Sequence, residues 1–178
     1  MNYNDYQKAR NASWQVLIDC KIAKLPTDLS QICRHYGIRI VKSSDLSAAK
    51  LLPGERGRSV QVDNQFFIIV RDTTAIQSQR YTIAHELGHI LLNTASEYIA
   101  ERFAIDILAP ACVLWGLQLR SAEDIARVCN ISAIAAEKRA QRMAVLYQRN
   151  MFLTAPMERQ LFDQFKDYIR MNSSTFDS

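Results

Sequence analysis

The sequence predicts an α+β fold that is mainly helical and has a small antiparallel sheet in its first half. Most of the chain places apolar residues at helical spacing, in segments bounded by Ser, Asp, Pro or Gly. Between residues 38 and 71 the pattern changes to short runs rich in β-branched and aromatic residues. The pattern His85-Glu86-Leu87-Gly88-His89 follows within a strongly apolar helical stretch.

The size and charge of the chain set its organisation. A chain of 178 residues with 48% hydrophobic residues can bury a core of its own. We expect a core at residues 1–118, with a helical segment at 119–178 packed on it as one compact unit. The net charge of +4 permits contact with nucleic acid but does not argue for it.

The sequence also indicates a cytoplasmic protein. No apolar run is long enough to cross a membrane, and the first residues lack the features of a signal peptide. The four cysteines show no C-x-x-C spacing. We therefore expect Cys20, Cys33, Cys112 and Cys129 to be reduced and mostly buried.

The chain before the sheet reads as two helices. The first is expected from Tyr6 to Lys21, ahead of a break at Pro26-Thr27. The second is expected from Asp28 to His35, and Gly37 stands where a left-handed C-cap belongs. His35 is not assigned as a metal ligand.

The predicted sheet has three short strands. Residues 38–41 alternate, residues 43–58 read as a loop, and 59–62 and 65–71 form a hairpin around Asp63-Asn64. One strand can act as an edge that pairs with an extended substrate. It can equally be a strand that covers the core, since the sequence does not show which strand lies at an edge.

The helix that follows, at residues 80–92, has the chemistry of a metal site. His85 and His89 are spaced i and i+4, so both imidazoles lie on one face and can hold one ion. Glu86 is placed to hold a water rather than to act as a primary ligand. Two His, a third protein ligand and an open position are the layout of a catalytic zinc site.

Glu97 is the candidate third ligand. It follows His89 across a short polar turn and begins a helix expected from Ser96 to Leu108, with Ser96 or Thr94 as N-cap. An acidic residue at this place can also simply complement the helix N-terminus. The spacing by itself leaves both interpretations open.

The residues around these positions resemble the ImmA/IrrE family of zinc metallopeptidases, including its prophage-type members. The first stretch is Arg80-Tyr-Thr-Ile-Ala-His-Glu-Leu-Gly-His, and the second runs from Glu97 to Pro110. The resemblance implies a zincin-like fold with one Zn²⁺ per chain. It implies that His85, His89 and Glu97 are the ligands and that Glu86 is the general base.

The chain departs from the family pattern at two points. The link between His89 and Glu97 is short, and Glu101 stands where the family has Asn. If the short link cannot close, Glu101 becomes the alternative third ligand. Otherwise we expect Glu101 to accept a hydrogen bond from a ligand imidazole.

The segment after Pro110 resembles a helix-turn-helix. Ser121 begins one helix, and Ser132 caps a longer one that runs through Tyr147. Basic residues on the longer helix can contact DNA or form a solvated face of a helix packed on the core, and we favour the packed helix; they are Lys138, Arg139, Arg142 and Arg149. A closing helix is expected within 152–169, with Pro156 in its first turn.

The resemblance implies a zinc-dependent endopeptidase that cleaves a specific cytosolic transcriptional repressor, typically a helix-turn-helix protein. Candidate oxyanion donors are Tyr98, Tyr81 and Tyr147. The alternative is a regulatory module that binds a repressor or DNA and has a structural zinc. His and carboxylate ligands also suit manganese, and the sequence specifies neither the scissile bond nor the oligomeric state.

Overall fold

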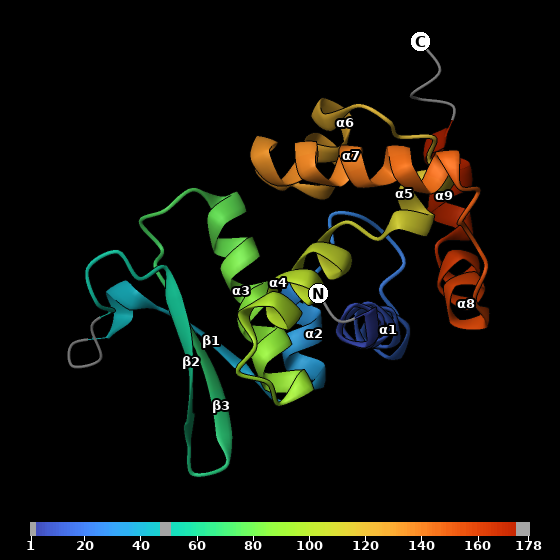
Figure 1. The fold of residues 1–178 in the computed structure, drawn as a ribbon. Coiled ribbons are helices and arrows are strands. Elements are labelled where there is room, and N and C mark those ends of the chain that lie inside the picture. The colour runs from blue at the N-terminus through green and yellow to red at the C-terminus, as the bar shows by residue number, and fades with distance from the viewer. Residues whose placement is uncertain (1–2, 47–50, 174–178) are drawn as a thin grey trace.

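The computed structural model describes residues 3–46 and 51–173. Helices α3 and α4 lie at the centre of the molecule, the sheet lies on one side of them, and α5 to α9 lie on the other (Figure 1). The elements in chain order are α1 (Tyr3–Asp19), α2 (Leu29–His35), β1 (Arg39–Lys42), a 3₁₀ turn (Ser43–Asp45), β2 (Gly57–Val62), β3 (Gln65–Val70), α3 (Ile76–Leu92), α4 (Glu97–Leu108), α5 (Ala111–Gly116), α6 (Ala122–Cys129), α7 (Ala133–Gln148), α8 (Pro156–Gln164) and α9 (Lys166–Asn172).

This architecture confirms the predicted α+β fold, but the sheet is mixed rather than antiparallel. The strand order is β1-β3-β2, and β1 runs parallel to β3 while β2 runs antiparallel to it. The long connection between β1 and β2 places β1 on the far side of β3, which a simple meander would not do. At the tip of the hairpin, Asp63 and Asn64 both have positive φ, as a two-residue type I′ turn requires.

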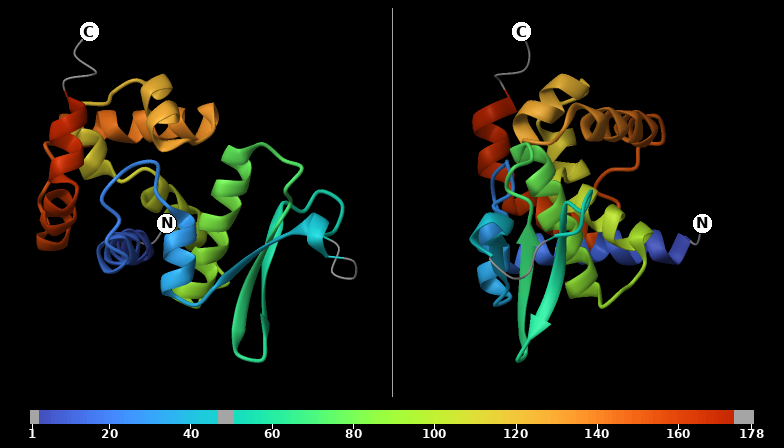
Figure 2. Two further views of the ribbon diagram at one scale, coloured as in Figure 1. Left: turned by 180° about the vertical axis from the view of Figure 1, so that it is seen from behind. Right: turned by 90° about the vertical axis from the view of Figure 1, so that its left-hand side faces the viewer.

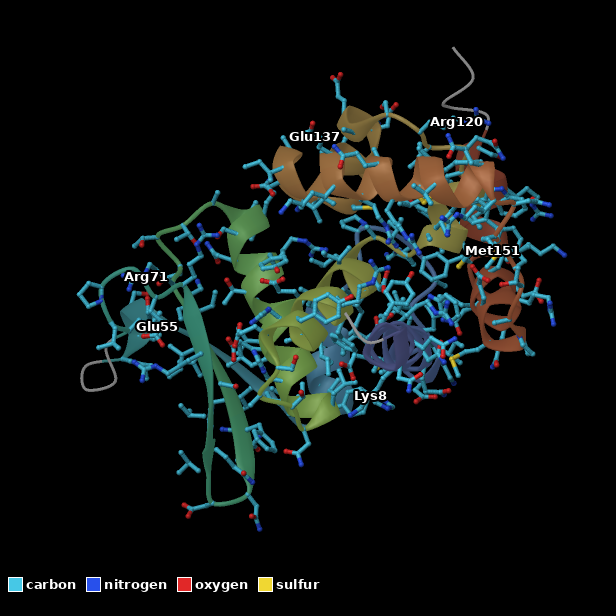
Figure 3. All side chains as sticks on the ribbon, viewed as in Figure 1. Lys8, Glu55, Arg71, Arg120, Glu137 and Met151 are labelled. Carbon is cyan, nitrogen blue, oxygen red and sulfur yellow. The ribbon has the colours of Figure 1, made fainter. Side chains whose placement is uncertain are left out.

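The segment before β2 is held against the end of β3 by one side chain. Arg71 donates from Nε to the Glu55 carbonyl oxygen at 2.7 Å and from Nη2 to the Leu52 carbonyl oxygen at 2.8 Å. Figure 3 shows Glu55 and Arg71 close together beside the sheet. These bonds fix the backbone that leads into Arg56 and β2.

Helices α3 and α4 approach each other closely at Gly88. A Cβ at this position would lie 3.0 Å from the Ala100 Cα and 3.2 Å from the Ala100 carbonyl oxygen. Asn93 ends α3 in the left-handed conformation, and the Ser96 side chain accepts from the Ile99 N–H to begin α4. The short link therefore closes and places the start of α4 beside the end of α3.

Helices α6 and α7 lie over the N-terminal end of α3 (Figures 1 and 2). Ser121 and Ser132 cap these helices as predicted, by accepting from the N–H groups of Asp124 and Ala135. Gln77 Nε2 on α3 donates to Asn130 Oδ1 at 3.0 Å in the turn between α6 and α7. The helical pair is thus attached directly to the metal-site helix.

Several predicted boundaries change in the structure. The first helix is Tyr3–Asp19 rather than 6–21, and Lys21 follows it with a positive φ. The closing helix is divided into α8 and α9 at Phe165, with Pro156 in the first turn of α8 as expected. The four cysteines are buried and unpaired, as predicted. Within the part of the chain that the structure describes, no helix has the length and apolar character needed to cross a membrane.

Candidate metal centre

Helix α3 brings the two histidines together on one face. The Nε2 atoms of His85 and His89 lie 3.1 Å apart, and their rings meet edge to face. Both side chains are half-buried. This is the arrangement that the i, i+4 spacing predicts.

Glu97, the first residue of α4, completes the cluster. Its Oε2 lies 3.1 Å from His85 Nε2, and its Oε1 lies 3.4 Å from His89 Nε2. Ligand atoms at about 2.0–2.1 Å from a tetrahedral ion are about 3.3–3.4 Å from each other. The three side chains therefore have the donor types and the spacing that fit zinc. Glu101 is not part of this cluster.

The backbone fixes the tautomer of one imidazole. His89 Nδ1 lies 2.8 Å from the Thr94 carbonyl oxygen, so its N–H donates there and the lone pair of Nε2 faces the cluster. His85 Nδ1 is buried and has no hydrogen-bond partner among the described residues. Across residues 3–46 and 51–173, Glu101 makes no hydrogen bond to either imidazole, so its supporting role stays a prediction.

Glu86 is held by the edge strand of the sheet. The Ser59 N–H donates to Glu86 Oε2 at 2.8 Å. The strand can approach α3 this closely because Gly57 has no side chain, and a Cβ there would lie 2.5 Å from both the Ile69 carbonyl oxygen and Thr82 Cγ2. The contact orients one carboxylate oxygen and leaves Oε1 to accept a proton.

A cleft of about 450 Å³ surrounds these groups, and it includes His85, Glu86, His89 and Glu97. Tyr81 also lines it and stacks on His85, with ring centroids 5.9 Å apart. Burial, and then the nearby carboxylates of Glu101 and Glu97, raise the pKa of Tyr81 to about 12. The Tyr81 hydroxyl therefore keeps its proton at neutral pH and can donate a hydrogen bond.

The three candidate oxyanion donors lie in different parts of the structure. Tyr81 lies in the cleft, whereas Tyr98 is an exposed residue of α4 that does not line it. Tyr147 packs against Phe152 near the C-terminal end of α7, with Arg120 over its ring. Tyr147 thus does not line the cleft, and α7 points its C-terminal end away from α3 (Figure 1).

Two backbone groups and one side chain of the site were not predicted from sequence. The Ser59 N–H and the Thr94 carbonyl carry no side-chain signature, so only the fold can assign them. Arg56 lines the cleft from the position directly before β2. It stands in the stretch 43–58 that the sequence analysis treated as a loop, and its charge alone did not distinguish it from other surface arginines.

The comparison with known protein families agrees with this geometry. Residues 33–141 match the model of the peptidase M78 family, described as the IrrE N-terminal-like domain. No curated protein matches the chain in the sequence search. The match spans α3, α4 and the sheet, and it confirms the resemblance to ImmA/IrrE proteins. Because it covers more than half of the chain, the protein belongs to the peptidase M78 family.

Proposed function

We propose that the protein is a zinc-dependent endopeptidase that cleaves one specific cytosolic transcriptional repressor and so relieves repression. One observation supports this most directly. His85, His89 and Glu97 converge within one cluster, and Glu86 lines the same cleft. A structural site would not require a carboxylate general base beside the ligands. The repressor as substrate, in the context of a mobile element or a stress response, rests on the resemblance to ImmA/IrrE proteins.

Different residues of the cleft have different roles in peptide hydrolysis. Zinc at this site would acidify a water and polarise the scissile carbonyl. Glu86 accepts the proton of the attacking water at Oε1 and later delivers it to the leaving amine, while the Ser59 N–H keeps Oε2 in place. The Tyr81 hydroxyl, which retains its proton, is the donor available to the developing oxyanion.

Strand β2 is an edge strand of the sheet and borders the metal cleft, where an extended substrate could pair with it. The Arg71 N–H donates to the Arg56 carbonyl oxygen, so this pair of residues is hydrogen-bonded. Along the antiparallel pair β2–β3, hydrogen-bonded pairs alternate with pairs whose backbone groups point outward. Gly57, Ser59 and Gln61 therefore direct their backbone groups away from β3. Ser59 already meets Glu86 on that side. A substrate strand added here would be read through its backbone, without selection for sequence.

The alternative, a DNA-binding module, depends on the basic residues of α7, and two of these are not available to bind DNA. Arg139 on α7 is 1% exposed, and its Nη1 donates to Asp106 Oδ1 at 3.0 Å. Arg142 is half-buried and donates to the Tyr6 hydroxyl. These two arginines attach α7 to the core, which leaves Lys138 and Arg149 on the exposed side. That charge is small for a phosphate-binding surface.

The test is a comparison of wild type with Glu86→Gln in cells, with new protein N-termini quantified by mass spectrometry. We expect a new N-terminus within a helix-turn-helix repressor in wild type only, with metal content equal in both proteins. Loss of function together with retained repressor binding supports the enzyme. Full function in Glu86→Gln would contradict the general-base assignment and support the binding module.

A further inference from the structure

A second pocket, of about 600 Å³, opens beside the metal cleft. We call it the α7 pocket. Its walls come from three helices: Ser78 and Tyr81 on α3, Ile105 and Leu108 on α4, and Ile134 at the start of α7. Neither the family match nor the proposed chemistry assigns a role to this pocket.

The α7 pocket adjoins the metal cleft. Arg56, Tyr81 and Glu101 line both. Tyr81 precedes His85 by one helical turn, or about 6 Å along the α3 axis at 1.5 Å per residue. An extended polypeptide advances about 3.3 Å per residue. An extended substrate that runs along α3 from the metal would therefore reach the α7 pocket about two residues from the scissile bond.

The interior of the α7 pocket is apolar. The lining residues Leu108 and Ile131 are buried, at 2% and 7% exposed, and they form part of its inner side. At the rim, Ile134 is 70% exposed, which leaves a large apolar side chain without cover. The charged lining residues have both signs, namely Arg56, Lys138 and Glu101. The pocket is therefore suited to an apolar side chain rather than to an anion.

The pocket is also preformed. Arg80 on α3 donates from Nε to the Asn130 carbonyl oxygen at 3.2 Å, in the turn that precedes α7. On the other side, Arg139 fixes α7 to Asp106 of α4. Because α3, α4 and α7 are connected in this way, their walls stay at fixed positions. A preformed site selects side chains at low conformational cost.

We propose that the α7 pocket is the specificity site of the peptidase and binds an apolar side chain of the substrate, two or three residues from the scissile bond. This inference rests on the proposed function. Pairing with β2 would fix the substrate backbone without reading sequence, and the α7 pocket would select the side chain. The helical pair thereby contributes to substrate choice rather than to DNA binding.

The test uses zinc-loaded protein and short peptide hydroxamates, whose hydroxamate group binds the metal. One series extends on the N-terminal side and a second on the C-terminal side of the hydroxamate. In each series a single Leu is moved through three positions of an otherwise all-Gly peptide. We expect Leu at one position, second or third from the hydroxamate, to lower the Kd by about tenfold in isothermal titration calorimetry.

Variants identify the pocket as the source of that gain. Ile134→Asp, an acidic residue compatible with the first turn of α7, should abolish the Leu gain and leave the Kd of the all-Gly peptide unchanged. Ile134→Leu should retain the gain. Met151→Asp is the matched control, because Met151 is also an exposed apolar residue and lies at the far end of the helical region (Figure 3).

Two outcomes would contradict the inference in different ways. Equal affinity for all peptides, or a Leu gain that survives Ile134→Asp, would overturn the role of the α7 pocket and leave the proposed metal chemistry intact. Failure of the all-Gly hydroxamate to bind zinc-loaded wild type would contradict the metal centre itself, and with it both proposals.

Discussion

At the residue scale, the site depends on which carboxylate reaches the imidazoles. Two glutamates one turn apart on α4 were candidates from sequence, and only Glu97 has carboxylate oxygens within 3.1–3.4 Å of both Nε2 atoms. Glu101 lies farther along the helix and borders both cavities. The two positions therefore predict different consequences for metal binding.

Glu97→Ala should weaken zinc binding by at least about 100-fold, because a ligand contributes more than the outer groups that support it. Glu101→Ala should change the affinity by less than about tenfold. Competition with a chromophoric chelator measures both values. Equal losses in the two variants would show that the carboxylates share the ligand role.

The cysteines give a second residue-scale prediction. Burial raises the pKa of Cys20 to about 11 and that of Cys33 and Cys129 to about 12, and it also raises the pKa of Cys112. The reactive thiolate is therefore scarce at pH 8. We expect the thiols of the native protein to react slowly with a disulfide reagent. After unfolding, all four should react and release four equivalents of the reagent's thiolate per chain. Rapid reaction of any thiol in the native protein would argue against this burial.

At the element scale, the metal centre requires α3 and α4 to lie unusually close. The glycine of the metal motif, Gly88, faces the backbone of Ala100 and the ring of Phe103. Its place between Leu87 and His89 reads in the sequence as helix interior, where Gly is unfavourable. The packing explains why this residue is small.

Gly88→Ala should therefore separate the two helices and weaken zinc binding, even though alanine favours the helix by about 1 kcal/mol. The added methyl must displace backbone, and such overpacking typically costs about 1–3 kcal/mol. Thermal unfolding and zinc affinity should be measured on the same preparation. A raised Tm with unchanged zinc affinity would show that the close approach does not limit the site.

At the scale of the whole molecule, a buried ion network joins the helical pair to the core. Arg102 binds Asp106 through two bonds of 2.7 and 2.8 Å, and Arg139 from α7 donates to the same carboxylate. Arg139 also donates from Nη2 to the Ala109 carbonyl oxygen. The helical segment after Pro110 is thereby connected to the helix that bears Glu97.

Asp106→Ala should destabilise the protein by about 3–5 kcal/mol, because two guanidinium groups lose their carboxylate and Arg139 is fully buried. Asp167→Ala is the matched control, since Asp167 pairs with Arg170 at 3.4 Å on the surface and such pairs add little. Urea denaturation followed by circular dichroism gives both values. Similar small losses would show that the buried network is not required for stability.

Local spacing along the chain is sufficient to predict several parts of this protein. These parts involve contacts within a few residues of the chain. They are the i, i+4 histidines, the capping residues Ser96, Ser121 and Ser132, and the Asp63-Asn64 turn. Local hydrogen bonds and backbone preferences are sufficient to place them. Most helices and the hairpin were predictable for this reason, but α5 and the division of the closing helix into α8 and α9 were not.

The features that join distant segments depend on how the elements pack and could not be predicted from local patterns. Three of them join residues that are at least 25 positions apart in the sequence. They are the parallel pairing of β1 with β3, the contact of the Ser59 N–H with Glu86, and the burial of Arg139 against Asp106. Backbone groups have no sequence signature. The sequence also does not distinguish a buried arginine from an exposed one, because this depends on which residues surround it in the fold. The position of Glu97 beside the two histidines agrees with the expected ligand set, and it depends on the packing of α4 against α3 at Gly88.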